Sequence, residues 1–323
     1  MKKHLIIIVV LTAIFSCKSD KKDGRTTPTK VKIIQEWFAN SNFAGELMAM
    51  YKTDSIQGID IELTEGSYDI DPIKMVLSNT FNIGVAGADK VLVANDKGAN
   101  LVVIGVVNKF SPTCFLSLKK NNITKPKDFE GKKIGILTGT ATEYVYRTLV
   151  AQQNLDKSKL DELEVSFDLN TFLNGSFDVR PAFVYDEPVS LELQKVAYNI
   201  IEPKDYGVEF LGTVYFCKKE YIDKNPKLVQ KIVNALASGW ENAIKDPTTA
   251  MNMLKKFAKD ANIKRETISF NKGLPYFEGE NKKVLTADVN RWKKMAESLI
   301  KLKVIKSFDD KSVNNSFITN YHK

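Results

Sequence analysis

The chain has 323 residues, of which 43% are hydrophobic, and 47 lysines and arginines against 39 aspartates and glutamates give a formal net charge of +8. The basic residues are spread along the sequence without a run interleaved with aromatic residues, which argues against a nucleic-acid-binding groove. The two histidines, His4 and His322, lie at the ends of the chain. Most histidine-based catalysis and any histidine-ligated metal site are therefore excluded from its body, and we expect neither a metal nor a cofactor.

The N-terminus has the features of an export signal. Two lysines precede an apolar run from Leu5 to Phe15, which is shorter than the roughly 20 residues that span a bilayer. The letters IFSC at residues 14–17 resemble a bacterial lipobox, although Phe15 is bulky for its position. We expect a lipoprotein signal peptide over residues 1–16 and a lipidated Cys17 that anchors the protein. Residues 17–30 then form a flexible polar tether. A plain secretory signal is the alternative.

Strand and helix patterns alternate through residues 31–107. The predicted strands cover residues 31–38, 59–63, 81–85 and 101–107, and the predicted helices cover residues 43–51, 72–77 and 88–95. Asp71-Pro72 supplies an N-cap and a proline at the first helical position, which marks a helix start. The run at 101–107 is continuously apolar, as in a strand covered on both faces. The alternation predicts βαβ units and a mainly parallel sheet.

The alternation restarts after residue 130 and then gives way to helices. Strands are predicted at residues 133–137, 164–167, 182–185 and 210–217, and helices at residues 140–152 and 188–196. Three further helices begin at Pro226, at Pro247 and after Asp288.

This order of elements predicts an α/β fold of two lobes. Lobe 1 would comprise residues 31–110 and 215–323, and lobe 2 would comprise residues 111–214. The chain would cross between them near residues 108–113 and 207–214. A ligand would lie between the lobes, where strands end and helices begin.

Cys114 and Cys217 are the cysteines that follow the signal. An oxidising envelope would permit a disulfide between them. Each lies in a strand-like apolar run, so two buried free thiols are the alternative, and the sequence does not decide between the two.

Several characteristic segments follow one another along the chain. They are NIGVAGAD at 82–89, GANLVVIG at 98–105, ITKPKDFEGKKIG at 123–135, YGVEF at 206–210, YIDKNP at 221–226, and the GW and DP pairs at 239–240 and 246–247. In this order they resemble the substrate-binding proteins of ABC importers, in the class that binds nitrate, sulfonates, taurine and thiamine pyrimidines. One departure is Asn82, where the family usually has aspartate. The resemblance implies a venus-flytrap fold of the periplasmic-binding-protein type II kind, which closes on a small molecule by hinge motion. It also implies an ABC permease as partner, a monomer, and a location in the bacterial cell envelope, facing the periplasm or exterior.

The first group of candidate ligand-binding residues follows the first strand. Trp37 and Phe38 could stack on a planar ligand, with Asn40, Asn42 and Phe43 just after them. The alternative is that either Trp37 or Phe38 is a core residue, because neighbours on a strand point to opposite faces.

A second group lies at the later strand-to-helix turns. Thr138, Gly139, Thr140, Ala141 and Thr142 begin a helix, whose N-terminus could bind an anion. Threonine capping is the alternative, and Glu143 would oppose an anion.

A third group completes the candidate site. At the turn near Pro188, Glu187 could accept hydrogen bonds from an aminopyrimidine, next to Tyr185. The remaining candidates are Gly87 and Ala88, for close backbone approach, and Phe110 and Ser111, at the crossover.

These residues favour a planar, amine-bearing thiamine pyrimidine precursor over a sulfonate, because no arginine lies in the candidate turns. A sulfonate, taurine or nitrate receptor of the same fold remains the alternative. Some members of the resembled group synthesise the thiamine pyrimidine with a cysteine cluster and an active-site histidine. This chain has neither, so we expect a binding protein and not an enzyme. A sensor or scavenging lipoprotein without a permease is a further alternative.

Overall fold

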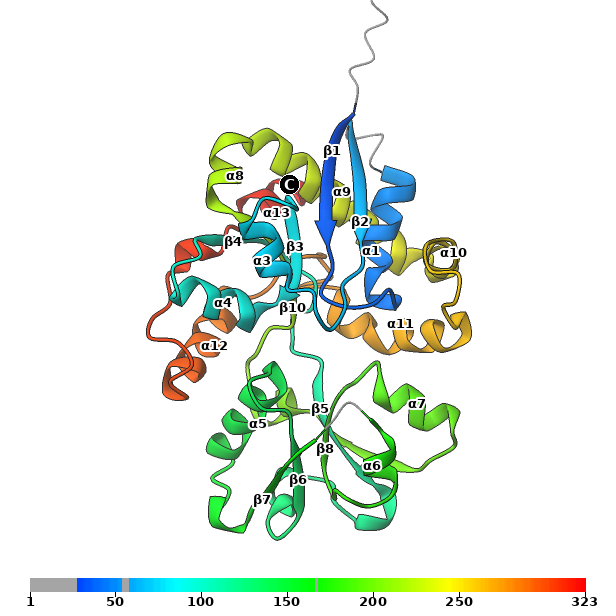
Figure 1. Cartoon of the computed structure of the whole chain (residues 1–323), viewed down its shortest axis with the longest axis vertical. Coiled ribbons are helices and arrows are strands. Elements are labelled where there is room, and N and C mark those ends of the chain that lie inside the picture. Colours follow the sequence, from blue (N-terminus) through cyan, green and yellow to red (C-terminus); the bar gives the residue numbers. More distant parts are fainter. Residues whose placement is uncertain (1–27, 54–57, 166–167) are drawn as a thin grey trace, which may run out of the picture.

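The computed structural model describes residues 28–53, 58–165 and 168–323. The predicted signal peptide, Cys17 and most of the tether lie outside these residues. The described chain folds into two lobes, one above the other, joined by two crossing segments (Figure 1). No helix in these ranges is both long enough and apolar enough to cross a membrane.

Lobe 1 is built on a five-stranded sheet with the order β2-β1-β3-β10-β4. The strands are β1 (Thr29–Ile34), β2 (Ile59–Thr64), β3 (Ile83–Gly87), β4 (Leu101–Val106) and β10 (Thr213–Lys218). β1 pairs in parallel with β2 and β3, whereas β10 runs antiparallel to β3 and β4. Every residue of β4 is buried, as its continuous apolar run predicts. The carboxyl ends of β1, β2 and β3 point towards lobe 2 (Figure 1).

Helices cover both faces of this sheet. The core on one face includes residues of α1 (Ala44–Met48), α9 (Pro226–Lys245), α10 (Pro247–Phe257) and α11 (Ile263–Phe277). The core on the other face includes residues of α3 (Pro72–Leu77), α4 (Ala88–Asp96) and α12 (Val289–Lys301). Asp71 caps α3 by accepting from the Ile73 and Lys74 N–H groups, which confirms the predicted helix start. α8 (Lys219–Lys224) and α13 (Ser316–Tyr321) complete the lobe.

Lobe 2 combines antiparallel and parallel pairs. β5 (Thr113–Leu118) lies between β8 (Arg180–Phe183) and β9 (Tyr198–Ile201) and is antiparallel to both, and β6 (Lys133–Ile136) pairs in parallel with β7 (Asp161–Glu164). Its α-helices are α5 (Ala141–Gln152), α6 (Asn170–Leu173) and α7 (Glu187–Leu193). Single helical turns span Ser41–Phe43, Ala49–Thr53, Lys119–Asn121, Pro126–Phe129, Lys157–Lys159, Pro203–Tyr206 and Asp310–Ser312.

The two crossing segments are hydrogen-bonded to each other. The Ser111 N–H donates to the Phe210 carbonyl at 2.7 Å, and the Gly212 N–H donates to the Asn108 carbonyl at 3.1 Å. A Cβ atom on Gly212 would lie 2.7 Å from the Asn108 Cβ, so this close approach requires glycine. The predicted lobe boundaries fall at these segments and stay predictions. Lobe 1 was predicted to resume at residue 215, and β10 of its sheet begins at Thr213.

β1 and α11 differ from the sequence-based expectation, and the two cysteines follow one of its two alternatives. β1 ends at Ile34, so Trp37 and Phe38 lie in the loop after the strand and not on it. α11 was not predicted, because Gly273 and Pro275 interrupt its pattern. Cys114 and Cys217 are both buried and free, on strands of different sheets.

Candidate functional site

A pocket of about 960 Å³ opens between the lobes, at the carboxyl ends of β1 and β3. In an open α/β sheet, this end of the strands is where ligands bind. Most of the lining comes from lobe 1, and Gly139 and Tyr144 of lobe 2 close the opposite side. The lobe 1 lining residues are Glu36, Trp37, Ser67, Tyr68, Asp69, Ile70, Asp71, Pro72, Ile73, Lys74, Leu77, Asp89, Lys90, Val93, Ala94, Lys97, Gly98 and Ala99.

Two aromatic side chains, Trp37 and Tyr68, form one wall of this pocket, and Phe38 packs against both of them. The ring of Trp37 lies 5.6 Å from that of Phe38 and 4.7 Å from that of Tyr68, and the Phe38 and Tyr68 rings are 5.5 Å apart, all edge to face. Phe38 is 43% exposed and Tyr68 is 65% exposed. Because neither Trp37 nor Phe38 is on a strand, both can join the same aromatic group. Tyr68 was missed, since nothing in its local pattern distinguishes it from a surface loop residue.

Two carboxylates stand beside the aromatic wall. Glu36 accepts the Gly87 N–H at 2.9 Å and also accepts from the Lys90 ammonium. Asp89, at the start of α4, is 4% exposed. Burial, reinforced by the charge of Glu36, raises the pKa of Asp89 to about 6. The sequence analysis missed both acids, although each lies at the carboxyl end of a predicted parallel strand, which was an available signal.

The threonine-rich turn before α5 binds its own carboxylates. The Thr138 N–H and hydroxyl donate to Glu164 at 3.2 and 2.5 Å, and the Gly139 N–H donates to Glu143 at 2.7 Å. The Thr140 hydroxyl donates to the Leu137 carbonyl at 2.6 Å and lies 2.8 Å from the hydroxyl of Thr142, while Ala141 begins the helix. The N–H groups of Thr138 and Gly139 are thus occupied, and the side chains of Glu143 and Glu164 lie where an oxyanion would approach them.

Tyr185 connects lobe 2 to lobe 1. It is 6% exposed, and its ring packs against Tyr276 and Phe277 of α11, with centroids 6.4 and 5.8 Å away. The side chain of Asn42 in lobe 1 hydrogen-bonds its hydroxyl. Burial raises the pKa of Tyr185 far above its ordinary value, so the phenol is neutral and can donate.

Glu187 is held within lobe 2. One oxygen accepts the Phe183 N–H at 3.0 Å, and the other lies 3.5 Å from the Arg180 guanidinium. The carboxylate therefore binds its own turn and not the pocket between the lobes, and we leave it out of the proposed contacts.

The other predicted residues have local roles. Asn40 accepts the Asn42 N–H at 2.8 Å and caps a helical turn. Phe43 is 1% exposed and packs in the core with Phe257, so it does not reach the pocket.

The candidates near the crossing segments make contacts within the protein. The buried Ala88 donates its N–H to the Gly212 carbonyl at 2.9 Å. The ring of Phe110 lies 3.9 Å from the Arg291 guanidinium, and Ser111 belongs to the paired crossing segments. Of the predicted site residues, Trp37 and Gly139 line the pocket.

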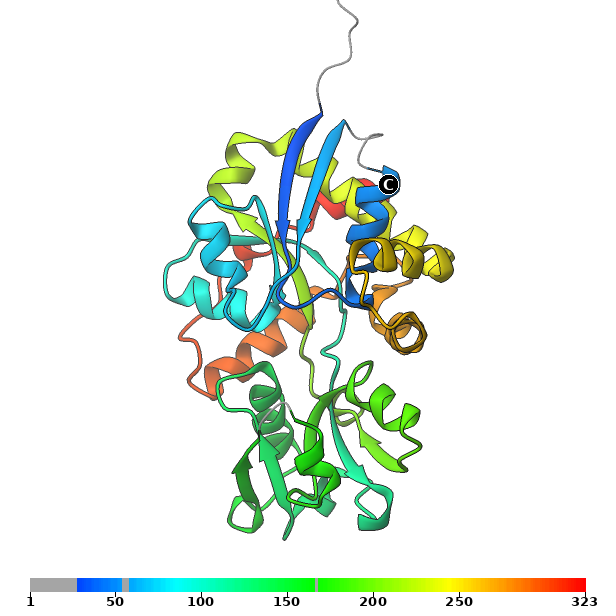
Figure 2. The same cartoon turned by 45° about the vertical axis from the view of Figure 1, so that its right-hand side comes forward.

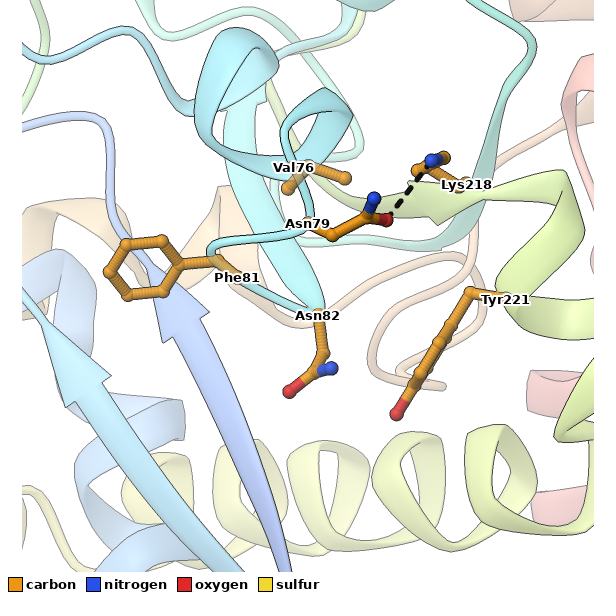
Figure 3. A pocket seen from close by; sticks show the side chains of 6 residues that line it. All are labelled: Val76, Asn79, Phe81, Asn82, Lys218 and Tyr221. Atoms are coloured by element: carbon orange, nitrogen blue, oxygen red, sulfur yellow. Dashed lines mark hydrogen bonds between the residues drawn. The ribbon is translucent and has the colours of Figure 1, made fainter.

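A second, small pocket of about 40 Å³ lies at the opposite end of β3 (Figure 3). Asn79 accepts a hydrogen bond from Lys218 at 3.0 Å across it, and Tyr221 lines one side. This volume holds a few water molecules at most, so no heterocycle fits there.

Comparisons with known proteins agree with this architecture. A family described as NMT1/THI5 like matches residues 40–250. The chain is 21% identical over 271 residues to the formylaminopyrimidine-binding protein of Halalkalibacterium halodurans, covering 81% of this chain and 82% of that protein. It is 21% identical over 276 residues to the 4-amino-5-hydroxymethyl-2-methylpyrimidine phosphate synthase of Schizosaccharomyces pombe, covering 81% and 78%. The structure of the periplasmic sulfonate-binding protein SsuA from Methylobacillus flagellatus KT matches with a TM-score of 0.72 at 14% identity, covering 91% and 94%. This match confirms the predicted two-lobed fold.

Proposed function

Because the chain belongs to the NMT1/THI5-like family, we propose that it is a solute-binding protein for a thiamine pyrimidine precursor. The ligand would bind between the two lobes and be delivered to an ABC permease. The observation that carries this proposal is the pairing of an aromatic wall with two carboxylates, Glu36 and Asp89, in one pocket.

The aromatic wall suits a flat heterocycle. Trp37, Phe38 and Tyr68 support one another edge to face, an arrangement that leaves ring faces available for offset stacking. Across the pocket, Tyr144 offers a phenol from lobe 2. A planar ring between these walls would contact both lobes at once, as ligand-driven closure requires.

The carboxylates suit a ligand that donates N–H groups. An ionised carboxylate accepts hydrogen bonds and donates none. An aminopyrimidine presents exocyclic amine hydrogens, and the relative in Halalkalibacterium halodurans is named for a formylaminopyrimidine. We infer the same ligand class for this chain.

A sulfonate fits the pocket less well. The described lining residues include three lysines, Lys74, Lys90 and Lys97, but no arginine for bidentate recognition. The Lys90 ammonium is paired with Glu36, and the Thr138 and Gly139 N–H groups are bound by Glu164 and Glu143. An oxyanion that binds Lys90, Thr138 or Gly139 would have to displace a carboxylate from that group.

An enzymatic role like that of the Schizosaccharomyces pombe synthase is disfavoured by residue chemistry. The histidines of this chain are His4 and His322. The ring of His322 contacts the carbonyl of Val284, and neither His322 nor Val284 lines the pocket. Cys114 and Cys217 are buried and separate. We therefore propose binding without catalysis, by a monomer anchored through Cys17 outside the cytoplasm.

A thermal-shift screen tests the ligand class. The panel contains a formylaminopyrimidine, 4-amino-5-hydroxymethyl-2-methylpyrimidine, taurine, an alkanesulfonate and nitrate. A ligand at 100 times its dissociation constant should stabilise the protein by about 2.7 kcal/mol. We expect a shift with the aminopyrimidines alone. A shift with a sulfonate alone would reject the proposed ligand.

A further inference from the structure

Asp89 is almost completely buried and also lines the pocket. Its side chain is 4% exposed, yet it lines the space between the lobes. Within the described residues, the hydrogen-bond donors at its carboxylate are the backbone N–H groups of Asp89 and Lys90, with no side-chain donor. A buried carboxylate without a side-chain partner is costly, and one that faces a ligand-sized pocket is placed to receive a donor from outside the protein.

Charged and titratable groups surround Asp89 on each element packed against it. Glu36 comes from the loop after β1, Lys90 follows on α4 itself, and Tyr144 projects from α5 of lobe 2, where the charge of Asp89 contributes to raising the pKa of the phenol. Asp71, the cap of α3, also acts on Lys90. Because the Lys90 ammonium is bonded to Glu36, its charge acts on both acids, and it only partly offsets the burial and the Glu36 charge that raise the pKa of Asp89.

A carboxylic acid matches one edge of a 4-aminopyrimidine. That edge has an amine donor beside a ring-nitrogen acceptor. A neutral carboxyl group can donate its proton to the ring nitrogen while its carbonyl oxygen accepts from the amine. An ionised carboxylate makes only the second of these bonds, and a sulfonate offers no such edge.

We propose that Asp89 is a specificity-determining residue that binds the aminopyrimidine edge as a shared-proton pair, so that the complex holds one proton between ring nitrogen and carboxyl. This inference rests on the proposed function, and it adds that Asp89 recognises the ligand and that the complex holds one shared proton. The same count holds whether the proton resides on Asp89 or on the ring.

The pH dependence follows from this count. The pKa of Asp89 in the free protein is about 6, so the group is protonated below that pH and ionised above it. Binding favours the protonated form and must take up a proton at higher pH. Affinity should therefore be full well below pH 6 and about half of that at pH 6. It should fall by at least about tenfold between pH 6 and pH 8, because each unit of pH above the pKa costs up to tenfold.

A purely structural role for Asp89 makes a different prediction. The carboxylate lies at the N-terminus of α4, where it also stabilises the helix, and its replacement could lower stability alone. Asp89→Asn separates the two roles. An amide keeps the size, donates through Nδ2 and accepts through Oδ1 at any pH, so it imitates the neutral acid without titrating.

The test is calorimetry with a formylaminopyrimidine at pH 6 and pH 8, in two buffers of different ionisation enthalpy. For the wild type we expect weaker binding at pH 8 and an uptake of nearly one proton. Asp89→Asn should bind with similar affinity at both pH values and take up no proton. Asp89→Leu should lose more than tenfold at pH 6. Asp223→Asn, a matched change on the surface of α8, should behave as wild type.

The outcomes distinguish this inference from the proposed function. Normal binding with a flat pH profile, no proton uptake and an unaffected Asp89→Leu would overturn the role of Asp89 and leave the ligand class standing. If no aminopyrimidine binds at either pH, the proposed function fails and this inference fails with it.

Discussion

Trp37 stands at the centre of the aromatic wall, with Phe38 and Tyr68 edge-on against it. Stacking of a heterocycle on one aromatic side chain contributes roughly 1–3 kcal/mol. We expect Trp37→Ala to weaken binding of a formylaminopyrimidine by about tenfold or more, measured by calorimetry, while Trp37→Phe retains most of the affinity. Glu187→Gln serves as a comparison, because its oxygens are bound within lobe 2. A loss with Glu187→Gln but not with Trp37→Ala would contradict the wall's role.

Glu46 is a buried acid in the core of lobe 1. It is 0% exposed, accepts from the Gln35 amide at 2.6 Å, and lies beside the Tyr215 hydroxyl. Burial raises its pKa from 4.5 to about 7. The folded state therefore holds more protons than the unfolded state between these pH values, and stability falls as the pH rises through that window.

Replacing Glu46 with glutamine removes this titration. Relative to wild type, Glu46→Gln should gain on the order of 3 kcal/mol of unfolding free energy on going from pH 4.5 to pH 8. Urea unfolding at several pH values measures it, with Glu220→Gln on the exposed surface of α8 as the control. Parallel stability curves for wild type and Glu46→Gln would show that burial does not perturb this group.

The helix α11 of lobe 1 lies beside α7 of lobe 2 where the two lobes meet (Figure 2). The Ser269 hydroxyl donates to the Tyr185 carbonyl at 2.5 Å, and the Arg265 guanidinium pairs with Asp186 of lobe 2. Further along, Lys272 pairs with Glu192 at 2.8 Å. These contacts lie on the side of the cleft away from α3 and α4, so the pocket opens on the other side.

Loosening this contact should change the arrangement of the lobes more than the stability. Partly exposed ion pairs contribute about 0–1 kcal/mol, so Arg265→Gln should lower the Tm by no more than about 4 °C. Small-angle X-ray scattering of the unliganded variant should show a larger radius of gyration than wild type. Lys227→Gln on α9 is the control. An unchanged radius would mean that α11 does not restrain lobe 2.

Local signals predicted most elements but not all of their ends. Asp71-Pro72 and Asp246-Pro247 marked helix starts that the structure confirms, because capping and proline act within a few residues. α11 was not predicted, because Pro275 near its last turn resembles a helix stop. β1 ends before Trp37 because pairing with β2 and β3 stops at Ile34, a limit set by neighbours distant in sequence.

At the scale of the whole molecule, the sequence predicted the two-lobed α/β fold, and the location of the ligand between the lobes stays a prediction. Alternating strands and helices imply that architecture, since parallel strands need crossovers. The composition of the pocket could not be predicted in the same way. Glu36, Asp89 and Tyr144 come from three separate segments and meet only through tertiary packing. The threonine turn looked available for an anion because the carboxylate of Glu164, on a different strand, was not known to reach it.

The most direct test of the central claim is calorimetric titration of the wild-type protein at pH 6 with a formylaminopyrimidine and, separately, with an alkanesulfonate. We expect binding of one aminopyrimidine per chain, with an affinity at least about tenfold lower in Trp37→Ala, and no measurable heat from the sulfonate. One-to-one binding of the sulfonate without binding of the aminopyrimidine would contradict it.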